Sequence, residues 1–115
     1  MQVTWIQSQA KSWLNLNTFN LSTVGDDKGV YVIWHGGNPG RVVRVGQGNI
    51  ADRLGIHRGD RKVQAYAASI LYVTWANVAA HLMNGIERYL ADTWNPLVGD
   101  AFPNALAIAV NSPWG

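Results

Sequence analysis

The chain contains no cysteine, which excludes both a disulfide framework and a zinc site built on thiolates. This absence is typical of proteins from reducing compartments, and we expect a cytoplasmic protein. No run of about 18 apolar residues is present, so we expect no membrane-spanning helix. The first five residues carry neither a basic start nor a long apolar core, so we also expect no signal peptide.

Charged residues are sparse, and glutamate is nearly missing. Six of the seven acidic residues are aspartate, and the single glutamate is Glu87. The net charge is only +2, but six of the nine basic residues lie in one segment: Arg41, Arg44, Arg53, Arg58, Arg61 and Lys62. Such a concentration favours a polyphosphate partner. A solvated face that aids solubility is the alternative, and the sequence weighs the two about equally.

The chain has 115 residues, 48% of them hydrophobic, which predicts one domain (residues 1–115) with one core. Two β-branched runs, at residues 29–34 and 41–48, are separated by a glycine-rich spacer at residues 35–40. This pattern predicts a β-hairpin. Within the first run, Tyr31 alternates with its valine neighbours, so it should point to the opposite face of the sheet.

Two short helices are predicted on either side of this hairpin. Apolar residues near helical spacing predict a helix over residues 4–14 that packs on the sheet. Residues 49–57 predict a second helix, in which the side chain of Asn49 caps the first turn. Asp52 near its start suits the positive end of the helix dipole.

The second half of the chain predicts a strand and a longer helix. Residues 70–76 form an apolar run rich in β-formers, which predicts a third, central strand. Asn77 is then expected to cap a helix over residues 78–93, which Pro96 stops. Residues 106–110 predict either a short strand or a packed tail. The fold class is therefore α+β: a small, mainly antiparallel, three-stranded sheet flanked by helices.

Several short motifs then occur in a suggestive order. Gly29-Val30-Tyr31 lies on the first hairpin strand, and Arg44-Val45-Gly46 begins thirteen residues after Tyr31 on the second. These two motifs resemble the pair that names the GIY-YIG nuclease family, with valine in place of isoleucine in the first. Arg53 and His57 fall where that family has an arginine and, one turn later, a tyrosine or histidine. Glu87 falls where the family has its metal-binding glutamate.

The resemblance implies a catalytic role for four side chains. Glu87 would bind Mg²⁺ or Mn²⁺, since one carboxylate with phosphate oxygens and waters is an ordinary magnesium site. Arg53 would hold the scissile phosphate through its planar guanidinium. His57 lies at i+4 from Arg53, so both reach one site, and it would take a proton from water directly or through Tyr31.

The resemblance covers about residues 29–104 and has two departures. Arg44 stands where the second motif has tyrosine, and arginine cannot act as a base at neutral pH. It would bind phosphate, lower the pKa of Tyr31, or mark a domain that binds nucleic acid without cutting it. The family's asparagine after the glutamate helix has only Asn104 as a late candidate. The other candidate substrate-binding residues are Arg41, Arg58, Arg61 and Lys62.

Each of the four catalytic candidates also has an ordinary structural interpretation. Tyr31 can be a half-buried packing residue, and Arg53 can pair with a neighbouring aspartate. His57 can serve a helix C-terminus, and Glu87 can belong to a solvated helix face. The combination in family order favours the site.

Three functions follow from these observations. The first is a metal-dependent endonuclease that hydrolyses phosphodiester bonds of DNA, with RNA as the alternative substrate. The chain carries no second DNA-reading element, so specificity would come from a homodimer, a partner protein or the shape of the substrate. The second is a non-catalytic nucleic-acid-binding module on the same scaffold. The third is a protein-interaction domain with a tryptophan-rich surface.

The six tryptophans divide into two groups. Three lie in or beside predicted core elements and are expected to pack: Trp34, Trp75 and Trp94. The other three are expected to stack on an unpaired base or to form a partner surface: Trp5, Trp13 and Trp114.

Overall fold

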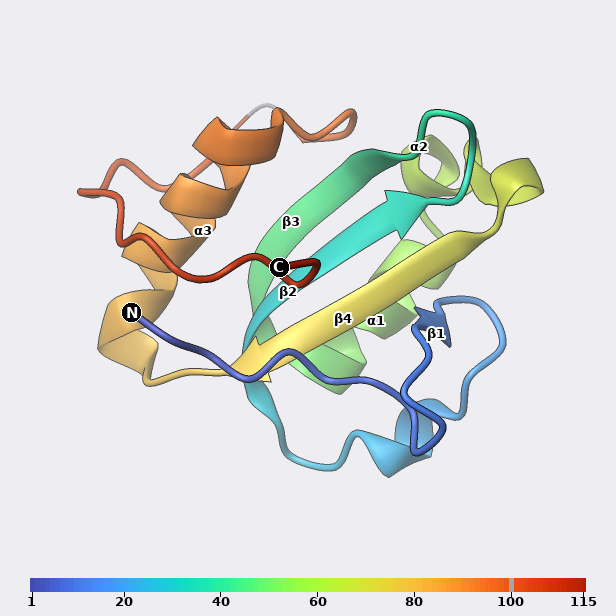
Figure 1. Cartoon of the computed structure of the whole chain (residues 1–115), viewed down its shortest axis with the longest axis horizontal. Helices are drawn as coiled ribbons and strands as arrows, with labels where there is room; N and C mark the ends of the chain where they lie inside the picture. Colours follow the sequence, from blue (N-terminus) through green and yellow to red (C-terminus); the bar gives the residue numbers. More distant parts are fainter. Residues whose placement is uncertain (100) are drawn as a thin grey trace.

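The chain folds around a four-stranded antiparallel sheet with the strand order β1-β4-β2-β3 (Figure 1). The computed structural model describes residues 1–99 and 101–115. The strands are β1 (Leu14–Asn15), β2 (Lys28–His35), β3 (Arg41–Asn49) and β4 (Leu71–Asn77). The α+β class is confirmed, but the expected three-stranded sheet is wrong. The two-residue strand β1 pairs with Val73 and Tyr72 of β4, and a strand this short has no readable sequence pattern.

Helices cover both faces of the sheet (Figure 1). They are α1 (Ile50–Arg58), α2 (Arg61–Gln64) and α3 (Ala80–Trp94), with two 3-10 turns, η1 (Leu21–Thr23) and η2 (Ala67–Ser69). None of the described helices combines the length and the apolar character needed to cross a bilayer.

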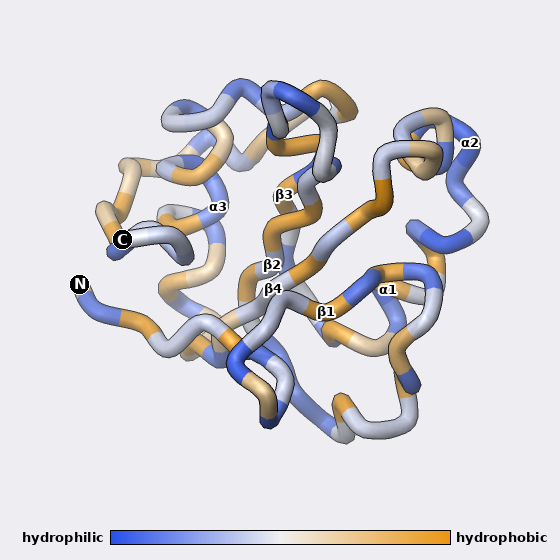
Figure 2. Tube along the Cα trace, turned by 45° about the vertical axis from the view of Figure 1, so that its right-hand side comes forward, coloured by the Kyte–Doolittle hydropathy of each residue, from blue (hydrophilic) through white to orange (hydrophobic). Residues whose placement is uncertain are grey.

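Two hydrophobic cores lie on opposite faces of the sheet. Tyr31 and Ile33 of β2 pack with the apolar side of α1 on one face. Val30 and Val32 pack with α3 on the other. The predicted alternation of Tyr31 with its valine neighbours is therefore confirmed. The strands in the middle of the molecule are largely apolar, and most hydrophilic residues lie on the periphery (Figure 2).

The β2–β3 hairpin is confirmed, and its register positions the functional residues. Tyr31 pairs with Gly46, and Ile33 pairs with Arg44. Trp34 then pairs with Val42, so the register shifts by one residue between Ile33 and Trp34. This irregularity is of the β-bulge type and falls at Val43, which packs in the same core as Tyr31, whereas regular pairing already places Arg44 on that face.

The helix after the hairpin is confirmed, and the long helix begins later than expected. The Asn49 side chain accepts a hydrogen bond from the Asp52 backbone N–H at 3.0 Å. Helix α3 starts at Ala80 with no side-chain cap, so the expected capping by Asn77 is wrong. The strand β4 runs on through Asn77 instead. Asn95 ends α3 in the left-handed conformation, just before Pro96.

The helix expected over residues 4–14 is wrong. This segment runs irregularly along β4: the Ile6 N–H donates to the Trp75 carbonyl at 2.9 Å, and the Thr74 hydroxyl donates to the Ile6 carbonyl at 2.8 Å. The exposed edge of β4 thus supplies backbone partners that outweigh a weak helical pattern. Residues 106–110 form a packed tail, in which the Ile108 N–H donates to the Gly85 carbonyl at 2.9 Å.

Arg58 braces the fold, although the sequence made it a candidate for substrate binding. Its Nε donates to the Leu16 carbonyl at 2.7 Å, and its Nη2 donates to the Phe19 carbonyl. The guanidinium also lies 5.5 Å from the centre of the Phe19 ring. These contacts join the end of α1 to the loop after β1.

We predict that Arg58→Ala lowers the free energy of unfolding by about 1.5–3 kcal/mol, because it removes charge-assisted hydrogen bonds from two carbonyls. Urea unfolding measures the change. The matched control is Arg61→Ala, an exposed arginine on α2, which should change stability by less than about 0.5 kcal/mol. Equal stability of the two variants would contradict the bracing role.

Candidate active site

The centre of the candidate site is a buried hydrogen bond between two elements. The Tyr31 hydroxyl on β2 lies 2.6 Å from Nε2 of His57 on α1. Tyr31 is 0% exposed and His57 is 2% exposed. Because His57 is one turn after Leu54 on the inner face of α1, the helix packing itself delivers the imidazole to the tyrosine.

Gly46 makes room for this tyrosine. Gly46 pairs directly with Tyr31, and a Cβ at position 46 would collide with the phenol ring and its hydroxyl. The ring therefore lies across β3, and its hydroxyl reaches the edge strand of the sheet. The glycine of the Arg44-Val45-Gly46 motif thus has a steric reason.

Two arginines lie beside the tyrosine hydroxyl. Burial raises the pKa of Tyr31, and the nearby guanidinium groups of Arg53 and Arg44 oppose this rise. The Nε atoms of both arginines are buried and have no hydrogen-bond partner among the described residues. The ion pairs of the described residues are His57–Asp60 and Arg88–Asp92, so neither arginine pairs with a described carboxylate within 4.0 Å.

Glu87, on α3, lies near the same two arginines. It is 7% exposed, and burial raises its pKa, whereas the Gln47 amide and the charges of Arg44 and Arg53 lower it. Gln47 Nε2 also donates to Asn84 Oδ1 at 2.7 Å, which joins β3 to α3. The carboxylate therefore lies near both arginines without a close ion pair to either of them.

His57 is neutral at physiological pH. Burial lowers its pKa to about 4, and the charges of Arg44 and Arg53 act in the same direction. Asp60 opposes this, with Oδ2 at 3.9 Å from His57 Nδ1. Nδ1 is buried without a hydrogen-bond partner among the described residues. With the proton on Nδ1, Nε2 is free to accept the hydroxyl proton of Tyr31.

The structure thus brings together five of the candidate residues named from the sequence, which we call the Tyr31 cluster: Tyr31, Arg44, Arg53, His57 and Glu87. They come from β2, β3, α1 and α3.

The remaining candidate substrate-binding residues lie outside this cluster. Lys62 lines a pocket of about 590 Å³ together with Arg44, Asp60 and Tyr66. Arg41 is exposed at the start of β3, and Arg61 is exposed on α2. Arg58 is engaged by backbone carbonyls, and Asn104 is exposed in the segment after α3.

Sequence reasoning missed three residues that the geometry makes important. Gln47 positions the surroundings of Glu87, Asp60 faces His57, and Gly46 admits the tyrosine ring. Gly46 lay within a motif, so its sequence signal was present. Gln47 and Asp60 had none, because their partners are distant in the chain or separated by a turn.

Gly46→Ala tests the steric role of the glycine. We predict that it lowers the free energy of unfolding by about 1–3 kcal/mol, because the added methyl group overpacks the Tyr31 ring. The matched control is Gly55→Ala on α1, where a Cβ meets nothing closer than 3.9 Å. That change should raise stability by about 0.5–1 kcal/mol through helix propensity. Urea unfolding of both variants measures the difference, and a neutral Gly46→Ala would refute the packing.

The pKa of His57 predicts a pH dependence of stability. The fold favours the neutral imidazole, so the unfolded chain binds its proton first as the pH falls below about 6.5. The contribution of neutral His57 to the free energy of unfolding is fully present above pH 6.5, and it is lost as the pH falls toward the folded pKa of about 4. The gap between the unfolded pKa of 6.5 and the folded pKa of about 4 corresponds to at most roughly 3.4 kcal/mol of folding free energy. His57→Gln should lack this slope in urea unfolding between pH 4 and 7, and an unchanged slope would refute it.

Comparison with known proteins adds no family to this geometry. No family model, no curated protein and no solved structure matches the chain.

Proposed function

We propose that this chain is a metal-dependent endonuclease that hydrolyses phosphodiester bonds of DNA, with a GIY-YIG-like site. One observation carries the proposal. Two buried arginine Nε–H groups without described partners lie beside a buried tyrosine–histidine hydrogen bond. Unpaired buried donors are costly, so a site that keeps them is suited to an anion that satisfies them.

Arg44 and Arg53 supply the phosphate-binding part of the proposal. Each guanidinium is planar and donates two parallel hydrogen bonds to a phosphate. Neither has a described carboxylate within 4.0 Å that would compete with the phosphate. Arg44 thus replaces the second-motif tyrosine with a second positive charge, which stabilises charge developing on the phosphoryl oxygens.

Tyr31 and His57 supply a proton path. A water donates its proton to the Tyr31 oxygen as the tyrosine proton moves to His57 Nε2. The water oxygen forms its bond to phosphorus, the bond from phosphorus to the leaving sugar oxygen breaks, and that oxygen takes a proton from solvent. The raised pKa of Tyr31 makes a free tyrosinate unfavourable, so the two transfers occur together. Asp60, 3.9 Å from Nδ1, stabilises the imidazolium that results.

Glu87 is the residue that would hold Mg²⁺ or Mn²⁺. It is a buried carboxylate without a described ion-pair partner, and it lies beside the arginines that would hold the phosphate. The described residues contain no group of three or more His, Asp or Glu side chains that could hold a metal ion. One carboxylate together with substrate oxygens and waters fits magnesium. The bound cation would neutralise charge on the phosphate and the leaving oxygen.

A non-catalytic nucleic-acid-binding module is the second candidate, and one observation favours it. Tyr31 is 0% exposed, so water reaches its hydroxyl only if an adjacent side chain moves. The same arginines would bind phosphate without any cleavage. Substrate choice between DNA and RNA, and a homodimer or partner protein for specificity, belong to either candidate.

Plasmid nicking in Mg²⁺ or Mn²⁺ tests the enzyme. We predict that Glu87→Gln and Arg53→Ala each lower the cleavage rate by about 10²-fold or more, since they remove groups that act on the transition state. Asp92→Asn is the matched control, because Asp92 is an exposed carboxylate on α3 that pairs with Arg88. It should cleave at the wild-type rate.

DNA binding without divalent cation separates the two candidates. The enzyme proposal expects Glu87→Gln to bind DNA at least as tightly as the wild type, because a negative charge is removed. Salt-sensitive binding by the wild type with no cleavage in either cation would refute the enzyme and support the module.

A further inference from the structure

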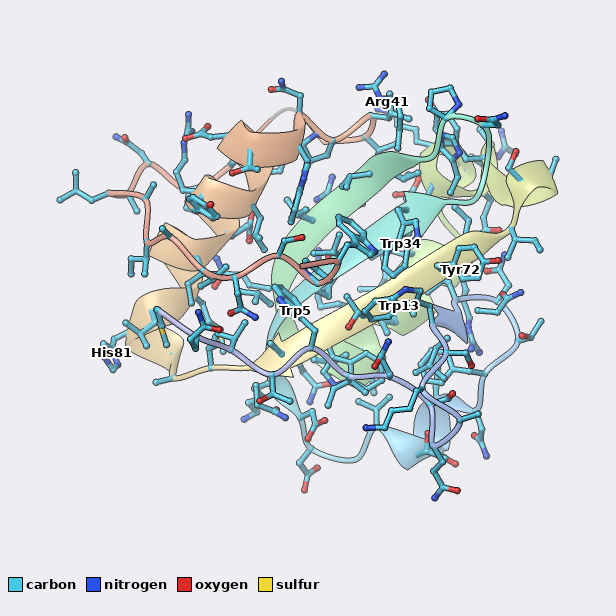
Figure 3. The ribbon with its side chains drawn as sticks, in the orientation of Figure 1. Trp5, Trp13, Trp34, Arg41, Tyr72 and His81 are labelled. Atoms are coloured by element: carbon cyan, nitrogen blue, oxygen red, sulfur yellow. The ribbon has the colours of Figure 1, made fainter. Side chains whose placement is uncertain are left out.

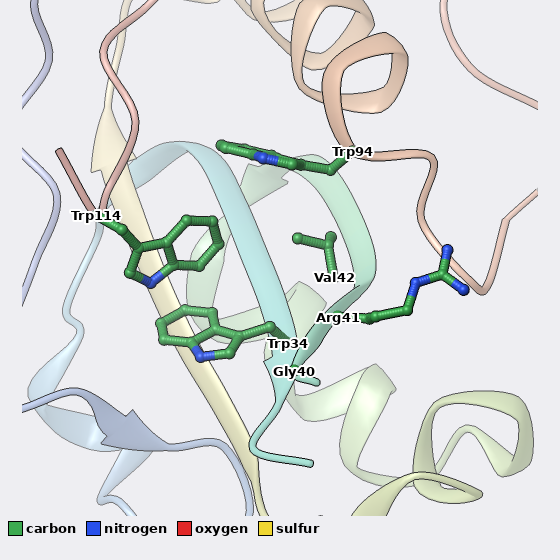
Figure 4. A pocket seen from close by; sticks show the side chains of 6 residues that line it. All are labelled: Trp34, Gly40, Arg41, Val42, Trp94 and Trp114. Atoms are coloured by element: carbon green, nitrogen blue, oxygen red, sulfur yellow. The ribbon is translucent and has the colours of Figure 1, made fainter. Parts of the chain in front are cut away.

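An aromatic pocket lies near the start of β3 (Figure 4). Its volume is about 430 Å³, and three tryptophans line it together with Gly40, Arg41 and Val42. The tryptophans come from distant parts of the chain: Trp34 from β2, Trp94 from the end of α3, and Trp114 from the final segment. The Tyr31 cluster uses none of these residues.

The three tryptophan rings are arranged as walls. The Trp114 ring centre lies 5.0 Å from that of Trp34 at 87°, and 5.1 Å from that of Trp94 at 69°. Trp114 is 43% exposed, so one wall is accessible from solvent. The Trp34 ring also packs edge-on against Trp13, with ring centres 5.3 Å apart, and stacks on Tyr72, with ring centres 5.7 Å apart (Figure 3). These two contacts hold Trp34 in place.

The positive charge of Arg41 limits the kind of ligand that suits this pocket. Arg41 is exposed at its rim, and it has no described carboxylate within 4.0 Å. A fixed positive charge disfavours a cationic ligand, which aromatic walls alone would attract. It favours a ligand that combines a flat apolar ring with an anionic group, and a nucleotide has both.

The pocket and the Tyr31 cluster lie on opposite faces of the sheet, and they share its edge strand β3. Arg41 precedes Arg44 by three residues on β3, so the Cα atoms of the two residues are at most about 10 Å apart, the span of three residues in a regular extended strand. A single nucleic-acid strand can therefore contact both arginines.

We propose that the aromatic pocket binds an unpaired nucleobase of the nucleic acid, with an adjacent phosphate on Arg41. This proposal rests on the proposed function and deepens it. The substrate class becomes DNA with an unpaired segment next to the scissile phosphate. Trp34, Trp94 and Trp114 supply stacking surfaces that accept any base, so the pocket reads the unpaired state rather than sequence.

Fluorescence anisotropy of labelled DNA tests the pocket, with the full chain at low salt and without divalent cation. Three probes are compared: a blunt duplex, the same duplex with a short unpaired extension, and the same extension with abasic sites. The extension that carries bases should bind most tightly. Trp114→Ala should weaken binding of that probe by roughly 5- to 100-fold, the usual range for loss of base stacking, and should leave the blunt duplex unchanged.

Conservative variants separate stacking from folding. Trp114→Phe keeps a ring and should retain most of the affinity. The matched control is Trp75→Phe, because Trp75 lies in the core on the opposite face of the sheet and does not line the pocket. Arg41→Gln should weaken binding of both extensions, with and without bases, because it removes a phosphate contact.

Two outcomes would overturn the proposal in distinguishable ways. If the abasic extension binds as tightly as the one with bases, or if Trp114→Ala changes nothing, the pocket does not bind a base. Binding of the blunt duplex would then leave the proposed nuclease intact. If none of the three probes binds at low salt, both the pocket proposal and the nucleic-acid function are refuted.

Discussion

The close approach of Tyr31 to Gly46 is the constraint on which the candidate site depends. Most cross-strand pairs place two side chains next to each other, but here one partner has none. The phenol ring therefore lies across β3 instead of standing beside it. Only in that position does the hydroxyl meet His57 of α1 at 2.6 Å. The hairpin and the helix are thus joined by one buried polar contact, in a core that is otherwise apolar on this face.

This contact sets the electrostatics around it. Burial favours the neutral forms of Tyr31 and His57, and the two arginines strengthen this for the histidine but oppose it for the tyrosine. The result is a neutral acid–base pair beside two fixed positive charges. The Nε–H groups of these arginines are buried without described hydrogen-bond partners, which is costly, so the arrangement is poorly suited to stability alone. It is well suited to an anion, which is why we assign the surroundings of Tyr31 to phosphate.

The edge strand β3 connects this cluster to the aromatic pocket. Arg44 belongs to the first and Arg41 to the second, and the register shift opposite Ile33 and Trp34 lies between them. Without that shift, strict alternation would place Arg44 on the face opposite Val43, whereas both now lie on the Tyr31 side. The irregularity therefore lets Val43 pack in the core on the Tyr31 side while Val42 packs in the other core and lines the aromatic pocket.

Local sequence patterns determined those strands and helix ends that depend on residues within a few positions of one another. The hairpin, the Asn49 cap and the central strand follow from turn residues, a capping side chain and β-branched runs that act within a few residues. The order of the motifs also named the five residues of the Tyr31 cluster before any geometry was known.

Only the tertiary structure decided where each remaining segment and side chain found its partner. Residues 4–14 lie along β4 because that edge offered backbone hydrogen bonds. Arg58 holds a loop because the fold brings the carbonyls of Leu16 and Phe19 to its guanidinium, although these residues are 42 and 39 positions away in the chain. Trp114 forms a pocket with Trp34 and Trp94 because the fold brings the final segment against β2 and the end of α3. The physical cause is common to all three: hydrogen bonding and packing depend on spatial neighbours, and spacing along the sequence does not encode them.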